Sequence, residues 1–152
     1  MSRLLALGLA VVCLCAWAGA QGAEKGGQAA GKVRFEPVDV YVDSGAVPLA
    51  AYQFELKATA GRVAIVGLEG GEHAAFKDAP YYDPKALMKD RVVVAAFYTG
   101  RDLPHGRTRI ARLHMQVSGD EKPAYAVKLV VAASADGKKI PATLSIDKGD
   151  KP

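Results

Sequence analysis

Cysteine and tryptophan are almost absent from this chain of 152 residues. Its two cysteines, Cys13 and Cys15, and its one tryptophan, Trp17, all lie within the first twenty residues. Once those residues are removed, the remaining chain can form no disulfide and has no thiol nucleophile. It also lacks the large indole ring on which a flat polysaccharide platform usually depends.

The first twenty residues have the features of a targeting segment. A basic start at Arg3 is followed by an apolar run over 4–16 and by small residues at 18–20. This order is typical of a secretory signal peptide that is cleaved after Ala20. The run is shorter than the roughly 20 apolar residues of a membrane-spanning helix, and no second run follows it. We therefore expect a secreted or periplasmic protein of a bacterial cell envelope, without a transmembrane anchor after cleavage.

The chain also lacks a concentrated charge of one sign. Lys and Arg number 20 against 16 Asp and Glu, and the formal net charge of +4 falls to +3 once Arg3 is removed. The two signs are interspersed, without the basic stripe that is typical of nucleic-acid binding. We expect a solvated surface of mixed charge and no nucleic-acid partner.

Large apolar residues mark the limits of the folded unit. Residues 21–32 contain only Gly, Ala, Gln, Glu and Lys, and we expect a flexible leader there. Residues 148–152 are expected to form a disordered tail. The remaining stretch, 33–147, is long enough for one domain with its own hydrophobic core.

Within 33–147 the dominant pattern is alternation with a period of two. Apolar and polar residues alternate in 38–43, 52–57, 111–117 and 140–146. This pattern predicts strands with one buried and one solvated face, which puts Asp39, for example, on the solvated face. The runs 63–68, 92–98 and 127–133 are apolar at successive positions, and we expect central strands covered on both sides. Glycine-containing turns separate the runs, so the sequence predicts an all-β, antiparallel β-sandwich.

One long irregular segment, Gly70–Asp90, interrupts this pattern. Asp83 is followed by Pro84, which predicts an N-cap and the first residue of a short helical turn in a long loop. Tyr81 and Tyr82 lie between two prolines, so the backbone that carries them is restrained. Rigid tyrosines are good contact anchors for a protein or a sugar, and long loops in compact domains are often functional.

The order of these segments resembles a known group of domains. The stretches VDVYVDSG, AAYQFELKA, RVAIVGLEGGE, RVVVAAFY and LPHGRTRIARLHMQV follow one another in that order. The last two place a hydrophobic strand, a turn at Gly106 and a second strand in succession. This arrangement resembles the cohesin-like and related carbohydrate-binding β-sandwiches of bacterial exported proteins. The resemblance implies a jelly-roll-like sandwich that binds a protein module or a polysaccharide through one sheet face or loop end.

Motifs for catalysis are missing. No serine lies in a nucleophile-elbow pattern, and the three histidines, His73, His105 and His114, lack the spacing of a metal pair. We expect no enzymatic activity and no obligatory cofactor. Carboxylates in or beside the long loop leave calcium open as an alternative, since calcium prefers oxygen ligands. The candidate ligands are Glu69, Asp78 and Asp83.

Two hypotheses about function remain. The first is protein–protein recognition in the cell envelope or extracellular space, and the alternative is a glycan-binding module, with or without calcium. In both hypotheses the long loop is the predicted site, with binding residues Glu72, His73, Tyr81, Tyr82 and Asp83. A sheet face that carries Arg112, His114 and Gln116 is the second predicted surface.

Overall fold

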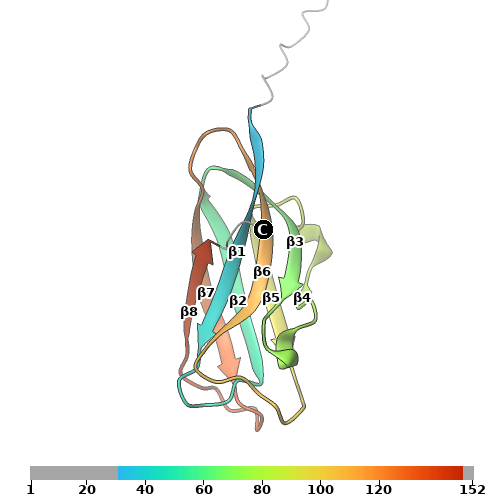
Figure 1. Cartoon of the computed structure of the whole chain (residues 1–152), viewed down its shortest axis with the longest axis vertical. Coiled ribbons are helices and arrows are strands. Elements are labelled where there is room, and N and C mark those ends of the chain that lie inside the picture. The colour runs from blue at the N-terminus through green and yellow to red at the C-terminus, as the bar shows by residue number, and fades with distance from the viewer. Residues whose placement is uncertain (1–30, 149–152) are drawn as a thin grey trace, which may run out of the picture.

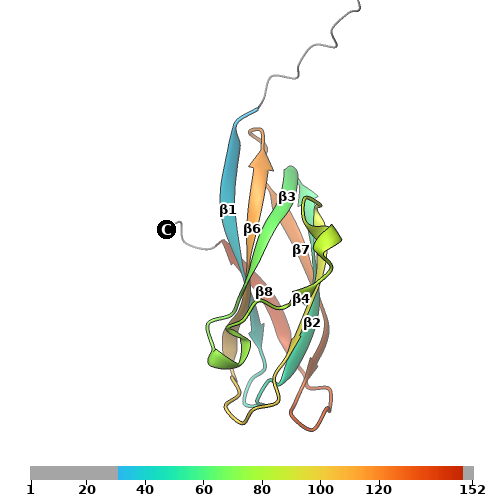
Figure 2. The ribbon, with the colours of Figure 1, turned by 90° about the vertical axis from the view of Figure 1, so that its right-hand side faces the viewer.

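Two antiparallel four-stranded sheets pack face to face in the computed structural model, which describes residues 31–148 (Figures 1 and 2). The elements in chain order are β1 (Val33–Asp43), β2 (Ala51–Ala60), β3 (Arg62–Gly70), η1 (Ala74–Phe76), β4 (Tyr81–Tyr82), η2 (Pro84–Ala86), β5 (Arg91–Phe97), β6 (Arg107–Ser118), β7 (Ala124–Ala133) and β8 (Thr143–Lys148), where η denotes a 3-10 turn. We call the sheet with order β3-β6-β1-β8 sheet A, and the sheet with order β4-β5-β2-β7 sheet B.

The predicted antiparallel β-sandwich is confirmed. Alternation places Val38, Val40 and Val42 of β1 in the core, where each is at most 1% exposed. The same pattern buries every second side chain of β2 and β6, and these side chains meet between the sheets. The predicted signal peptide and residues 21–30 of the predicted leader lie outside the described residues. No helix within 31–148 has the length and apolar character needed to cross a membrane.

The prediction that three runs form central, doubly covered strands is wrong in two respects. β3 and β7 are edge strands, because each ends the order of its sheet. β5 lies between two neighbours, but nothing in the described chain covers its outer face, where Val93 and Phe97 are exposed. A two-layer sandwich has only one buried face per sheet, so an apolar residue on the other face meets solvent.

The segment after β3 has more regular structure than one helical turn. It contains two 3-10 turns, η1 and η2, and between them the short edge strand β4. The predicted cap is present, because Asp83 accepts a hydrogen bond from the backbone N–H of Lys85 and Pro84 opens η2. Lys148, which the sequence assigned to the tail, is the last residue of β8.

Candidate functional site

An apolar surface lies on the outer face of β4 and β5. Because Val92 and Val94 point into the core, the alternate residues of β5 point outward. The register places Tyr81 of β4 opposite Ala95 of β5. We call this surface the Tyr81 face, and it consists of Tyr81, Val93, Ala95 and Phe97.

Two aromatic rings are the most prominent feature of the Tyr81 face. Tyr81 is 69% exposed and Phe97 is 63% exposed. Their rings stack with a centroid separation of 6.0 Å and an interplanar angle of 9°. Tyr82, the next residue along β4, instead packs against the hydrophobic core. The two tyrosines that the sequence treats as a pair therefore point to opposite faces of sheet B, as neighbouring residues in a strand do.

The segment that carries Tyr81 is anchored in the core by Phe76. Phe76 is 3% exposed, and its ring meets the ring of Tyr52 edge-on at 5.1 Å. The hydroxyl of Tyr52 donates to the carbonyl oxygen of Ile110 on the opposite sheet, at 2.9 Å. The backbone N–H of Gly71 donates to the carbonyl of Phe76 at 2.6 Å, which closes the segment into a tight loop. These contacts hold Tyr81 in place before any partner binds.

The two glycines before η1 allow the loop to lie this close to the sheets. A Cβ on Gly70 would overlap with the carbonyl oxygen of Lys77, and a Cβ on Gly71 would overlap with the carbonyl oxygen of Arg109. Both obstacles are backbone atoms, which cannot turn aside as a flexible side chain can. Glycine is therefore required at these positions by close packing.

The polar residues predicted in the long loop have local structural partners. Glu72 accepts a hydrogen bond from the backbone N–H of Arg109 at 2.8 Å. The Nδ1 atom of His73 accepts from the backbone N–H of Ala75 at 3.2 Å, and Asp83 caps η2. These three side chains shape the ends of the loop, and each is engaged with backbone rather than directed at a shared site.

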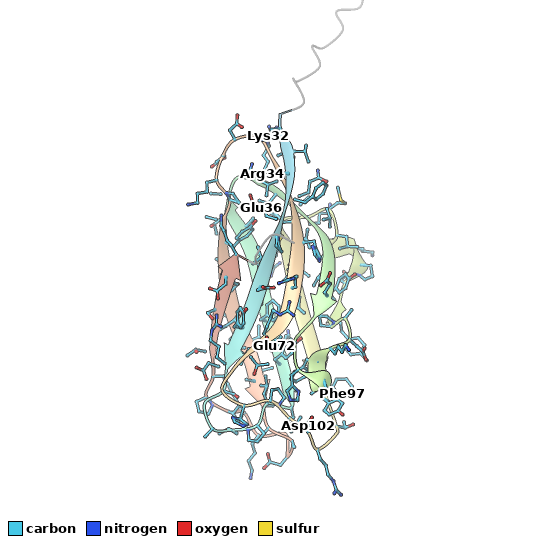
Figure 3. All side chains as sticks on the ribbon, in the orientation of Figure 1. Lys32, Arg34, Glu36, Glu72, Phe97 and Asp102 are labelled. Carbon is cyan, nitrogen blue, oxygen red and sulfur yellow. The ribbon has the colours of Figure 1, made fainter. Side chains whose placement is uncertain are left out.

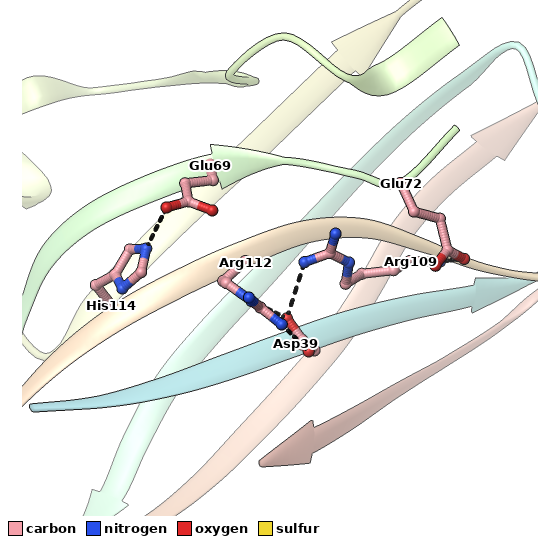
Figure 4. Close-up of polar contacts among 6 residues, drawn as sticks. All are labelled: Asp39, Glu69, Glu72, Arg109, Arg112 and His114. Carbon is pink, nitrogen blue, oxygen red and sulfur yellow. Dashed lines mark hydrogen bonds and ion pairs between the residues drawn. The ribbon is translucent and has the colours of Figure 1, made fainter. Parts of the chain in front are cut away.

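The second predicted surface lies on sheet A, the other layer of the sandwich. Asp39 of β1 accepts two hydrogen bonds from the guanidinium of Arg112, at 2.7 and 2.8 Å, and one from Arg109 at 3.3 Å (Figure 4). His114 lies 2.7 Å from Glu69. A hollow of about 320 Å³ is lined by Arg112, His114 and the exposed ring of Phe35, among others. Arg112 and His114 therefore lie on the other sheet from Tyr81, while Glu72 contacts β6 of sheet A and Tyr82 packs against the core.

The alternation predicts that Asp39 lies on a solvated face, but the structure shows that Asp39 is buried, with only 5% of its surface exposed. The two arginines of β6 cover it from the solvent side. Hydrogen bonding to Arg112 is the largest cause that holds the pKa of the Asp39 carboxyl below its ordinary value, with a smaller contribution from Arg109. The carboxylate of Asp39 is fully paired by the two arginines, which is typical of a structural ion pair.

Replacing this carboxylate should change the acid sensitivity of the domain. A carboxyl whose pKa is lowered by folding stabilises the fold above its unfolded pKa of about 3.9, and that contribution is lost as the pH falls through the folded value. We expect Asp39→Asn to cost about 1–3 kcal/mol at pH 7 and progressively less toward pH 2. Urea unfolding between pH 2 and 7 measures this difference. An equal loss of unfolding free energy at pH 2 and at pH 7 would show that the charge of Asp39 does not stabilise the fold.

The candidate calcium ligands are spread over the structure. Glu69 contacts His114, Asp83 caps η2, and Asp78 lines a hollow beside Tyr81. Within residues 31–148 no group of three or more His, Cys, Asp or Glu side chains is placed to hold a metal ion. Calcium binding stays a prediction.

Comparison with known proteins gave no relative: no protein-family model, no curated protein and no solved structure matches this chain. The resemblance to cohesin-like and carbohydrate-binding domains therefore stays a prediction.

Proposed function

We propose that this chain is an exported, non-enzymatic domain that recognises a protein partner in the cell envelope or extracellular space through the Tyr81 face. One observation carries the proposal: two stacked aromatic rings, Tyr81 and Phe97, are more than 60% exposed on an apolar patch of sheet B. Tyrosine and phenylalanine are enriched in the buried centres of protein interfaces, where charged residues are depleted.

The anchoring of the segment strengthens this proposal. Because Phe76 and the tight turn at Gly71 already fix the backbone before β4, ordering Tyr81 on binding costs little conformational entropy. Burying exposed apolar surface stabilises a complex by about 25 cal/mol per Å² before the costs of association are subtracted. A rigid aromatic pair therefore gives a higher affinity than the same residues on a flexible loop, because less conformational entropy is lost on binding.

The Tyr81 face is a better candidate than the edges of β3 and β7. The edge strand β7 carries Lys128 and has a register shift in its pairing with β2, opposite Gln53 and Phe54, and such bulges and lysines discourage strand pairing between chains. At the edge of β3, Ile65 exchanges backbone hydrogen bonds with Met88 and Lys89. These features oppose addition of a partner strand, whereas the Tyr81 face has no comparable protection in the described chain.

Glycan binding is the alternative, and the same aromatic pair is the observation that favours it, because sugars stack on exposed rings. Two details favour a protein instead. Tyr81 and Phe97 stack against each other, so neither ring offers both of its faces to a ligand. The remaining residues of the face, Val93 and Ala95, supply no hydrogen-bonding side chain for sugar hydroxyls.

The proposal is tested by capturing envelope and extracellular proteins on the immobilised domain. A tag ahead of residue 31 leaves the site free, because Lys32 and Phe97 lie at opposite ends of the molecule (Figure 3). We expect the wild-type domain to enrich a specific protein and Phe97→Ala to lose it. The matched control is Phe35→Ala, which removes a ring that is 64% exposed on sheet A.

Each outcome of this experiment decides between the hypotheses. Loss of the captured protein with Phe35→Ala, but not with Phe97→Ala, would move the site to the surface of Arg112 and His114. Retention on immobilised polysaccharide that depends on Phe97, with no protein captured, would establish the glycan alternative. Capture that neither variant affects would contradict both surfaces.

A further inference from the structure

A small hollow lies beside Tyr81 at the end of the Tyr81 face. Its volume is about 170 Å³, and it is enclosed by residues 74–76, 78–81 and 96–98. Pockets that take drug-sized molecules span roughly 300–1,000 Å³, so this hollow suits a single side chain of a partner. Its position next to the exposed aromatic pair makes it the natural place for an anchoring residue.

The chemistry of the lining indicates which side chain fits. Four aromatic residues line it, and three of them have exposed or partly exposed rings: Tyr81, Phe97 and Tyr98, whereas the ring of Phe76 is buried in the core. Aromatic ring faces carry partial negative charge and attract cations within about 6 Å. Asp78 adds an exposed carboxylate, and none of the ion pairs within residues 31–148 involves it. Rings and carboxylate together favour a positively charged group.

The two ends of the outer face of sheet B differ in charge. On the opposite half of β5, Arg91 forms a two-point ion pair with Glu55, and Lys57 and Lys128 lie close enough to Glu55 to lower its pKa together with Arg91. That half is therefore rich in positive charge, while the hollow carries the carboxylate of Asp78. A cationic group is thus attracted to the hollow and repelled from the other end.

We infer that the hollow formed by Asp78, Tyr81, Phe97 and Tyr98 binds a cationic side chain, lysine or arginine, of the protein partner. This inference rests on the proposed function and adds the chemistry of the residue that is recognised. The aromatic rings contact the alkyl stem and the charged head, and the Asp78 carboxylate accepts hydrogen bonds from the head group. The hollow therefore sets the position of the partner's cationic side chain relative to β5.

The test uses two small probes of similar shape that differ in charge. Nα-acetyl-arginine N-methylamide and its citrulline counterpart have almost the same shape, but citrulline is neutral. Each is titrated at constant ionic strength into ¹⁵N-labelled protein, and amide shifts are followed by NMR. We expect the arginine probe to shift the resonances of Asp78, Tyr81 and Phe97 at least threefold more than citrulline does. Asp78→Asn should lower the affinity for the arginine probe about two- to fivefold.

Three results would overturn the inference: equal shifts with both probes, no shifts with either, or an arginine affinity that Asp78→Asn leaves unchanged. Asp78 is exposed, so its substitution should leave folding intact, and the spectrum of the variant checks this directly. The two proposals fail separately. If Phe97→Ala loses a captured protein while the arginine probe does not bind, the Tyr81 face remains the interface and only the cationic anchor is wrong.

Discussion

Phe76→Ala is expected to destabilise the domain by about 3–5 kcal/mol, the range for removing a fully buried phenylalanine ring. The ring is 3% exposed and meets Tyr52 edge-on in the core. Its loss leaves a cavity between the sheets and also releases the only residue of η1 with a large side chain. Urea unfolding followed by circular dichroism measures the change.

The control for this experiment is Phe35→Ala, which removes the same side chain from an exposed position on sheet A. Surface substitutions of this kind usually change stability by less than about 0.5 kcal/mol. A cost below about 1 kcal/mol for Phe76→Ala would contradict the account, because it would mean that the long segment is not anchored by this ring.

Removing both rings of the Tyr81 face is expected to lower affinity for the protein partner by more than a hundredfold. Central aromatic residues of an interface typically contribute 2 kcal/mol or more each, and 1.4 kcal/mol corresponds to a factor of ten. The double variant Tyr81→Ala/Phe97→Ala should keep its melting temperature close to that of the wild type, because both rings are exposed. Isothermal titration calorimetry with the purified partner measures the affinity.

The single variants Tyr81→Ala and Phe97→Ala provide a second test of whether the partner binds the Tyr81 face. Because the two rings stack on each other, removing one also weakens the contact that the other makes. The effects of Tyr81→Ala and Phe97→Ala should therefore not be additive, whereas either combined with Phe35→Ala should be additive. A loss of less than fivefold for the double variant would show that the partner binds elsewhere.

Much of the fold could be predicted because alternation reports which residues share a face. The pattern in 38–43 and 111–117 places the valines and leucines of β1 and β6 in the core, as the structure shows. The cap at Asp83 could be predicted because it needs only neighbouring residues. Local rules of this kind act within a few positions and do not depend on how the sheets are ordered.

The position of the candidate site could be predicted only in part. The proline-framed setting of Tyr81 points to it as a contact residue, but the apolar run 92–98 places Phe97 in a strand expected to be covered on both sides. Periodicity says which residues lie on the same face, not whether another layer covers that face. The burial of Asp39 was missed for a similar reason, because it depends on Arg109 and Arg112, which are about seventy residues away. Such pairings follow from strand order, which alternation does not encode.

Hydroxyl-radical footprinting of the wild-type domain, alone and bound to its captured partner, shows whether the partner covers the Tyr81 face. Tyr81, Phe97 and Phe35 are exposed to nearly the same degree, 69%, 63% and 64%, so all three should be oxidised in the free protein. The Tyr81 face predicts that the partner protects Tyr81 and Phe97 and leaves Phe35 unchanged. Protection of Phe35, with Tyr81 and Phe97 oxidised as in the free protein, would contradict it.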